Sequence, residues 1–181
     1  MRIIAGKYKS RSVKAPNPKF TRPTTDMVKE SIFNMLQSRF DFTDVKVLDI
    51  YAGSGSLGLE ALSRGAKEIH FVELNFSVYK VLSSNIKSLD EENSCKIFRK
   101  SAVKFSAQTE YEKYDLIFAD PPFFEYDIHD VFKNIIANDF INENGIFIIE
   151  RSIQTEKKDV AGFGIEPIKK IGDSLIYWYE K

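Results

Sequence analysis

Two short stretches of this sequence combine residue types that could hold a small molecule and act on a flat amine. The first is Gly53-Ser54-Gly55, which lies between the apolar run VKVLDI and a leucine-rich stretch. The second is Asp120-Pro121-Pro122-Phe123, which directly follows the apolar run YDLIFA. Continuous apolar runs of this length indicate strands buried on both faces. Both stretches are therefore expected where a buried strand ends.

The glycine stretch predicts a strand, a tight turn and a helix that ends at Gly65 in a left-handed conformation. Glycine has no Cβ, so the backbone can approach a ligand closely, and the helix start offers free N–H groups. Glu73 lies twenty residues after Gly53 and ends the next apolar run. An acid at this spacing can accept hydrogen bonds from both hydroxyls of an adenosine ribose. Taken alone, the glycines also fit a dinucleotide site, G-x-G-x-x-G, or an ordinary tight turn.

In the second stretch, Asp120 and the Pro121 carbonyl form a pair of hydrogen-bond acceptors. Consecutive prolines have fixed φ and no N–H, so the loop is stiff. Phe123 adds an aromatic face. Two acceptors and one π-face suit an exocyclic amine on a flat heterocycle. Ligands of doubly wound sheets bind beyond the carboxyl ends of the strands, so the two stretches should share a cleft.

The rest of the chain supplies the elements that position these stretches. Strand and helix patterns alternate five times, which predicts a parallel α/β sheet with helices on both faces. Strands are expected at 45–50, 68–73, 96–99, 114–119 and 146–150, and helices at 25–39, 57–64, 77–88, 102–108 and 128–136. Two further runs, 165–171 and 175–179, flank Gly172-Asp173 and predict a closing hairpin with one antiparallel strand.

Two further expectations concern a turn and the first helix. Asn144-Gly145 is expected to form a turn before the fifth strand. The first helix should begin after a Thr24 or Thr25 cap and bury the stripe Val28, Ile32, Met35 and Leu36, with Lys29 outside it.

Composition limits the class of protein. A chain of 181 residues with 43% hydrophobic and 29% charged residues fits a single globular domain, 1–181. No apolar run reaches the roughly 18 residues that a membrane helix needs, and the N-terminus lacks a secretory core. A single cysteine, Cys95, is typical of a reducing cytoplasm. The two histidines are far apart in the sequence, which disfavours a zinc site. We therefore expect a cytoplasmic protein without a membrane anchor or a metal.

The N-terminal extension, residues 1–22, carries seven Lys or Arg and no acid. Ile3-Ile4, Gly6, Tyr8 and Val13 alternate with these charges as in a short β-hairpin. Basic residues interleaved with aromatic ones on an ordered hairpin suit a phosphate-rich partner, whereas a solvated basic tail is the plainer alternative. The expected RNA contacts are Arg2, Lys7, Lys9, Arg11, Lys14 and Arg22.

The motifs DIYAGSGSLGLEALSRGA, FVELN and DPPF closely resemble those of class I S-adenosylmethionine-dependent methyltransferases. RPTTDMVKESIFNML and RIIAGKYKSRSV narrow the resemblance to the bacterial RsmD-type family, which methylates guanine N2 in small-subunit (16S) ribosomal RNA. The resemblance is dense in motifs from Met1 to about Phe123 and looser beyond. It implies a Rossmann-like fold with a mostly parallel seven-stranded sheet, an antiparallel last strand and S-adenosylmethionine as donor. It also implies 16S rRNA or the assembling small subunit as the partner, and we expect the protein to act as a monomer.

The same resemblance assigns roles to individual residues. Donor contacts are expected from Asp49, Ala52, Gly53, Ser54, Gly55, Glu73, Leu74, Ser101 and Ala102, and catalytic contacts from Asp120, Pro121 and Phe123. The chain departs from the family pattern at Ser101-Ala102, where many relatives carry an acid that contacts the adenine amine. That contact then falls to Ser101 or to backbone groups.

Alternatives from other classes remain. The nearest is an amine methyltransferase that acts on DNA adenine N6 or on protein glutamine, since both resemble the same D/N-P-P-aromatic motif. A dinucleotide oxidoreductase would have no use for D-P-P-F or for the basic hairpin. A non-enzymatic RNA-binding protein is disfavoured because both halves of the site are intact.

Overall fold

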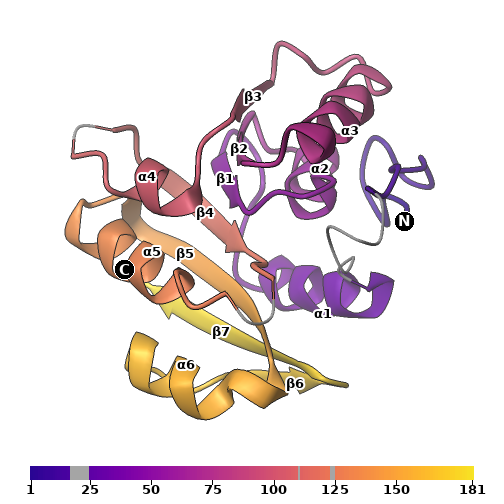
Figure 1. Ribbon diagram of the computed structural model, residues 1–181. Helices are drawn as coiled ribbons and strands as arrows, with labels where there is room; N and C mark the ends of the chain where they lie inside the picture. Colours follow the sequence, from indigo (N-terminus) through magenta and orange to yellow (C-terminus); the bar gives the residue numbers. More distant parts are fainter. Residues whose placement is uncertain (17–24, 110, 123–124) are drawn as a thin grey trace.

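The computed structural model describes residues 1–16, 25–109, 111–122 and 125–181, and its strands and helices alternate along the chain (Figure 1). The elements are α1 (Asp26–Gln37), β1 (Lys46–Ile50), α2 (Ser56–Ser63), β2 (Glu68–Val72), α3 (Phe76–Lys87), β3 (Cys95–Phe98), α4 (Ala102–Ser106), β4 (Tyr114–Ala119), α5 (Ile128–Ala137), β5 (Ile141–Ser152), a 3₁₀ turn η1 (Ile153–Thr155), α6 (Glu156–Phe163), β6 (Lys169–Ile171) and β7 (Ser174–Glu180).

The strands of the described residues form one seven-stranded sheet in the order β3-β2-β1-β4-β5-β7-β6. Strands β1 to β5 are parallel, and β7 runs antiparallel between β5 and β6. The predicted Rossmann-like sheet with a closing hairpin is confirmed. The order reverses between β1 and β4, where a doubly wound sheet opens a crevice beyond the carboxyl ends of its strands.

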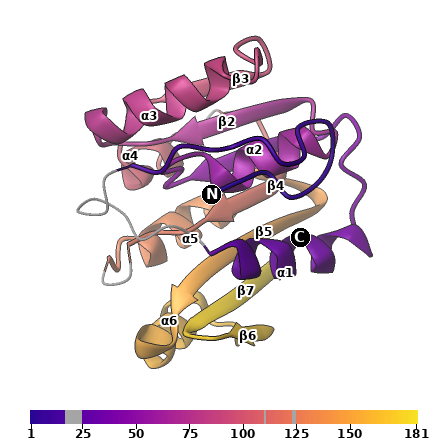
Figure 2. The ribbon, with the colours of Figure 1, turned by 90° about the vertical axis from the view of Figure 1, so that its right-hand side faces the viewer.

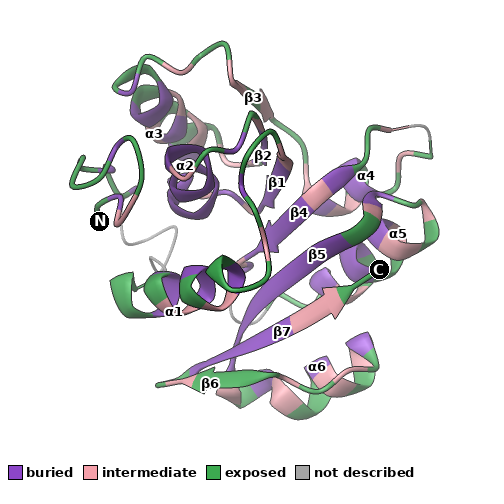
Figure 3. Cartoon of the chain, turned by 180° about the vertical axis from the view of Figure 1, so that it is seen from behind, coloured by how far each residue is buried: buried purple, intermediate pink, exposed green. Residues whose placement is uncertain are grey.

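The core lies on both faces of this sheet because successive side chains of a strand point to opposite sides. In β4, Leu116 and Phe118 join the cluster formed by α1, α2 and α3, whereas Ile117 and Ala119 join the cluster under α4 and α5. The central strands β4 and β5 are largely buried, and the edge strand β6 is exposed (Figure 3). In the described part of the chain, no helix is long and apolar enough to cross a membrane.

The structure differs from the prediction in two places, at helix α6 and at the turn expected before β5. Helix α6 was not predicted, because its sequence EKKDVAGF offers few apolar residues. The expected turn at Asn144-Gly145 is wrong, since both residues lie inside β5. There, Asn144 adopts a left-handed φ of 62° and its N–H donates to the Lys181 carbonyl, beside a register shift against β4. The strand β5 therefore continues through a register shift, and the Asn-Gly dipeptide alone resembles a turn.

Two predictions near the N-terminus also need correction. Lys29 is fully buried rather than facing solvent, although the Thr25 cap and the apolar stripe of α1 are as expected. Residues 1–16 do not pair as two strands, and a single antiparallel bridge joins Arg2 to Ser12. The segment instead folds as a tight loop beside α2 (Figure 2), with Ile3, Tyr8 and Val13 buried. A Cβ on Gly6 would lie 1.8 Å from the Ser63 carbonyl oxygen, so this close approach requires glycine.

Candidate active site

The glycine turn joins β1 to α2 in a conformation that favours glycine. Gly53 and Gly55 have φ of 56° and 80°, and Gly55 caps α2 from the left-handed region. The Ala52 N–H donates to the Val72 carbonyl at 3.0 Å, which fastens the turn to the end of β2. Tyr51, also left-handed at φ 66°, donates its hydroxyl to Asp127 Oδ1 at 2.8 Å. The turn is thus tied to the end of β2 and to the start of α5.

Asp49 supports the turn from inside the protein. Its Oδ2 accepts the Gly58 N–H at 2.9 Å, and the carboxyl group is almost fully buried. Gly58 allows α2 to lie against β2, because a Cβ there would meet the Phe71 ring at 2.4 Å. Burial, with a smaller contribution from the charges of Asp120 and Glu73, raises the pKa of Asp49 to about 8 against the opposing Gly58 hydrogen bond. The charges of two neighbouring carboxyl groups therefore act on Asp49 at this edge of the sheet.

Glu73 follows β2 and faces the glycine turn. Its Oε2 accepts the Gly53 N–H at 3.0 Å and its Oε1 accepts the Asn75 N–H at 2.7 Å. Burial raises its pKa above the usual range, and the backbone donors oppose that shift. The structure therefore brings Glu73 to the glycine turn, as the twenty-residue spacing predicts. Leu74 lies beside it with 64% of its surface exposed.

Ser101 begins the next element along the same edge. Its Oγ accepts the Lys104 N–H at 3.3 Å, so the hydroxyl caps α4 and keeps its own hydrogen for another acceptor. Ala102 is buried behind it.

The acceptor loop, residues 120–122, leaves the carboxyl end of β4. β4 pairs in parallel with β1, with Ala119 opposite Ile50, so Asp120 lies at the same sheet edge as the glycine turn. Asp120 is partly buried and Pro121 is buried. The Pro122 carbonyl accepts from Arg151 Nη1 at 3.4 Å and from the Glu125 N–H at 3.0 Å. Phe123 lies outside the described residues.

A buried network that sequence reasoning missed stands behind this loop. Arg151 Nε donates to Asp159 Oδ2 at 2.9 Å, and both side chains are fully buried. Asp159 also bonds Thr155 Oγ1 at 2.5 Å and His129 Nε2 at 2.8 Å. The network therefore links β5, η1, α5 and α6 to the Pro122 carbonyl. Its only signal in the sequence is an arginine that follows the apolar run IFIIE.

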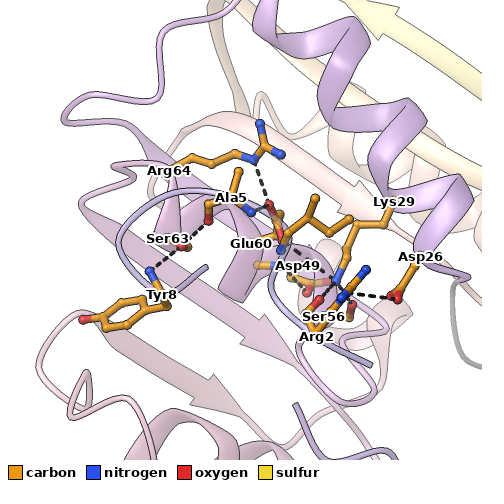
Figure 4. Close-up of polar contacts among 12 residues, drawn as sticks. Arg2, Ala5, Tyr8, Asp26, Lys29, Asp49, Ser56, Glu60, Ser63 and Arg64 are labelled. Atoms are coloured by element: carbon orange, nitrogen blue, oxygen red, sulfur yellow. Dashed lines mark hydrogen bonds and ion pairs between the residues drawn. The ribbon is translucent and has the colours of Figure 1, made fainter. Parts of the chain in front are cut away.

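The basic N-terminal segment is held on α2 by its own backbone. Glu60 accepts the N–H groups of Ile4 and Ala5 at 2.7 and 3.0 Å, and Ser63 Oγ accepts the Tyr8 N–H (Figure 4). Lys29 Nζ donates to the Arg2 carbonyl at 2.6 Å and to Ser56 Oγ at 3.2 Å. This part of the chain is therefore an ordered piece of the fold, with its basic side chains mostly toward solvent.

The N-terminal segment also contacts α3 and the residues that follow this helix. Lys7 pairs with Glu91, Arg11 donates to the Ser88 carbonyl, and Lys14 lies against Asn85. Asn85 also donates to the Ser54 carbonyl at 2.9 Å, so it links the segment to the glycine turn. Arg2 and Lys9 are exposed at the surface, and Arg22 lies outside the described residues.

Three side chains that could hold a metal ion lie near the amino-terminal end of β2, away from the glycine turn. Among the described residues, ligand atoms of Glu68, His70 and Glu112 lie within 4.8 Å of one another. Glu68 is already paired with Lys46 and Lys96 at 3.1 and 2.6 Å. These lysines supply the positive charge that a metal would otherwise bring.

Comparison with known proteins identifies the family of this chain. The family described as "Conserved hypothetical protein 95" matches residues 1–180. The chain belongs to this family. A relative in Bacillus subtilis, described as a candidate rRNA methyltransferase, is 37% identical over 90% of this chain and 88% of its own length. The "Ribosomal RNA small subunit methyltransferase D" of Haemophilus influenzae is 34% identical over 83% of this chain and 78% of its own.

A solved structure supports the fold of this family member. An Escherichia coli protein described as a candidate methyltransferase has a TM-score of 0.83 at 27% identity, over 100% of this chain and 97% of its own. The arrangement of the glycine turn, Glu73 and the acceptor loop at one sheet edge is thus set in a methyltransferase fold.

Proposed function

We propose that this protein transfers a methyl group from S-adenosylmethionine to the N2 amine of a guanine in small-subunit ribosomal RNA. The observation that carries the proposal is the meeting of Asp120, the glycine turn and Glu73 at the carboxyl edge of β4, β1 and β2. A donor at the glycine turn and an amine at Asp120 would then be neighbours. The choice of rRNA as the substrate rests on the relatives in the family, which are described as rRNA methyltransferases.

The charge of this edge favours a cationic donor over a dinucleotide. Asp49, Glu73 and Asp120 place three carboxyl groups there, and burial together with the charges of the other two raises the pKa of Asp49. A dinucleotide would bring an anionic pyrophosphate next to them, whereas the donor proposed here carries a positive sulfonium. The residues present therefore fit S-adenosylmethionine.

Each donor contact follows from a described position. Glu73 would accept hydrogen bonds from the ribose hydroxyls, exchanging its present bond to the Gly53 N–H. Ala52, Ser54 and Gly55 present the backbone of the turn, and Asp49 stiffens it from below. Leu74 offers an exposed apolar surface for the adenine ring, and the Ser101 hydroxyl and Ala102 backbone lie along the ring's expected edge.

At the acceptor side the chain orients a weak nucleophile. The Asp120 carboxylate and the Pro121 carbonyl would accept the two N–H bonds of the amine, which favours a pyramidal nitrogen with its lone pair toward the methyl carbon. The bound donor supplies that carbon as an electrophile, already activated by the sulfonium charge. The nitrogen would gain the methyl group as the carbon–sulfur bond breaks and S-adenosylhomocysteine leaves, and it would lose one proton, which Asp120 can accept and pass to water. Phe123 is proposed from the sequence to stack on the base.

The wider setting follows from the substrate. A guanine in a loop or single strand can leave its stack at low cost, so such an element is the proposed target. We propose that the protein acts as a monomer, folded as one domain, on 16S rRNA or on the assembling small subunit in the cytoplasm. The exposed basic side chains of the N-terminal segment are proposed to contact the phosphates.

A methyl-transfer assay tests the reaction. Tritium-labelled S-adenosylmethionine is offered with small-subunit rRNA, duplex DNA and a glutamine-containing protein, and labelled rRNA is digested to nucleosides. We expect label in N2-methylguanosine. Label in DNA N6-methyladenine or in protein would replace the proposal with the corresponding amine methyltransferase, and no transfer to any acceptor would refute it.

A substitution tests the role of Asp120. Loss of one preorganised hydrogen-bonding group typically costs about 10²–10³ in rate. Asp120→Ala should lose single-turnover rate by about that factor at saturating donor and RNA, while calorimetric binding of S-adenosylhomocysteine persists. Glu125→Gln removes an exposed acid of the same region and should methylate normally. A wild-type rate for Asp120→Ala would show that the amine is activated elsewhere.

A further inference from the structure

An exposed aromatic side chain marks the donor side of the sheet edge. Phe76 is the first residue of α3, four positions after β2 ends, and 51% of its surface is exposed. The Tyr79 ring lies nearly parallel to it, at 6.2 Å and 10°. Because α3 begins just beyond the carboxyl end of β2, this ring lies on the same rim as Glu73.

Two cations accompany the ring. Lys80 Nζ lies 4.5 Å from the centre of the Phe76 ring, and the Arg99 guanidinium lies 5.4 Å from it. Arg99 directly follows the last residue of β3, so α3 and the end of β3 contribute to this cluster. We call Phe76, Tyr79, Lys80 and Arg99 the rim cluster.

The segments that form the rim cluster carry an excess of positive charge, and Glu73 lies beside them just after β2. Residues 74–89 and 95–109 hold six Lys or Arg and not one Asp or Glu. The N-terminal segment packs on α3 through the Lys14–Asn85 and Arg11–Ser88 hydrogen bonds, so its positive charges adjoin this surface (Figure 1). An exposed ring with an excess of Lys and Arg around it complements a polyanion that also carries flat bases.

We propose that the rim cluster is a nucleotide-stacking site for the RNA substrate, on the donor side of the sheet edge and separate from the acceptor loop. A base would stack on Phe76 while Lys80 and Arg99 hold the flanking phosphates. This inference rests on the proposed RNA substrate and extends it to a surface separate from the N-terminal segment. Arg99 and Lys80 now lie over the ring, and phosphates would draw their charged ends outward.

Stacking is tested with Phe76 variants in the full chain. Phe76→Ala should raise the KM for RNA about tenfold, in the range of one base–aromatic stack, with kcat and the Kd for S-adenosylhomocysteine nearly unchanged. Phe76→Trp should restore the RNA KM because it retains a π-face. Ile168→Ala truncates a comparably exposed apolar side chain between α6 and β6 and should leave all three constants unchanged.

The charge contribution is tested by salt dependence of RNA binding. Arg99→Gln and Lys80→Gln should each lower the slope of log K against log salt by about one. Lys67→Gln, an exposed lysine just before β2 at the opposite sheet edge, should not.

The outcomes separate this inference from the proposed function. If the wild-type protein methylates rRNA and Phe76→Ala keeps the wild-type KM, the stacking site is refuted and the function stands. A rise in the S-adenosylhomocysteine Kd that matches the rise in KM would make Phe76 a donor contact and also refute the inference. If the wild-type protein neither binds nor methylates RNA, the function and the inference fail together.

Discussion

Two buried ion pairs stand behind the two loops of the site, and they are built differently. Behind the glycine turn, Lys29 and Glu60 lie 3.9 Å apart and bond mainly to backbone groups of residues 2, 4 and 5. Behind the acceptor loop, Arg151 and Asp159 are in direct contact at 2.9 Å. The first pair holds the N-terminal segment on α2, and its two members also hydrogen-bond to several backbone groups of that segment. In the second pair the two charged groups are in direct contact and fully buried, so it should be the more sensitive to substitution.

The largest effect is expected from breaking the second pair. Asp159→Ala leaves the Arg151 guanidinium buried without its carboxylate, and such a change costs about 3–5 kcal/mol in unfolding free energy. Urea denaturation measures it, with Asp130→Ala, an exposed acid of α5, as a control that should change stability by less than about 0.5 kcal/mol. A loss below about 1 kcal/mol for Asp159→Ala would show that the pair is not mutually dependent.

A double variant separates stability from positioning. Replacing a buried pair by apolar residues of similar volume is often neutral for stability, so Arg151→Met with Asp159→Leu should regain most of the lost free energy. The Pro122 carbonyl still lacks its Arg151 donor, and we expect kcat to stay about 10- to 100-fold low while S-adenosylhomocysteine binding is normal. Recovery of kcat together with stability would make the pair purely structural.

A smaller loss is expected from the first pair. In Lys29→Met, Glu60 still accepts the Ile4 and Ala5 N–H groups and the Arg64 Nε at 2.9 Å. Burial already lowers the pKa of Lys29, so the protonated form of this side chain is less favoured than it would be in water. We expect a loss of about 1–2 kcal/mol by urea denaturation. A loss as large as that of Asp159→Ala would remove the distinction between the two pairs.

The smallest effect concerns pH at the glycine turn. Asp49 has a pKa of about 8 in the ligand-free protein, so it is largely protonated below that pH. A cationic donor favours the ionised form and lowers this pKa. The affinity for S-adenosylmethionine relative to uncharged-sulfur S-adenosylhomocysteine should therefore rise a few-fold as pH increases toward 8, and then level off. Calorimetry at pH 6, 7, 8 and 9 measures the ratio, and Asp49→Asn should flatten it. A pH-independent ratio in the wild-type protein would contradict the coupling.

The local features of the site could be predicted because neighbouring residues encode them. The glycine turn, Glu73 and Asp120 each follow an apolar run directly, and parallel pairing of β1, β2 and β4 then brings the three strand ends together. The same local signals gave β4 with its observed bounds. Short-range pattern and sheet geometry were sufficient here.

The supporting network could not be predicted, because its partners are distant in sequence and look like surface residues. Lys29 was expected in solvent because helical periodicity sorts residues by polarity, and its partner Glu60 lies on another helix. His129 and Asp159 meet only after α5 and α6 pack, and α6 itself carries too few apolar residues to be recognised. Burial of a charge is decided by tertiary partners that no single window contains.

The position of β7 has a consequence for synthesis on the ribosome. β7 is made after β6 yet lies inside it, paired with β5 over seven register positions from Ile146–Glu180 to Ser152–Ser174. Until residues 174–180 leave the exit tunnel, the long apolar strand β5 presents an open edge to other chains. Synthesis that stalls before residues 174–180 emerge therefore leaves the edge of β5 open to aggregation. Pairing of β7 with β5 removes this open edge.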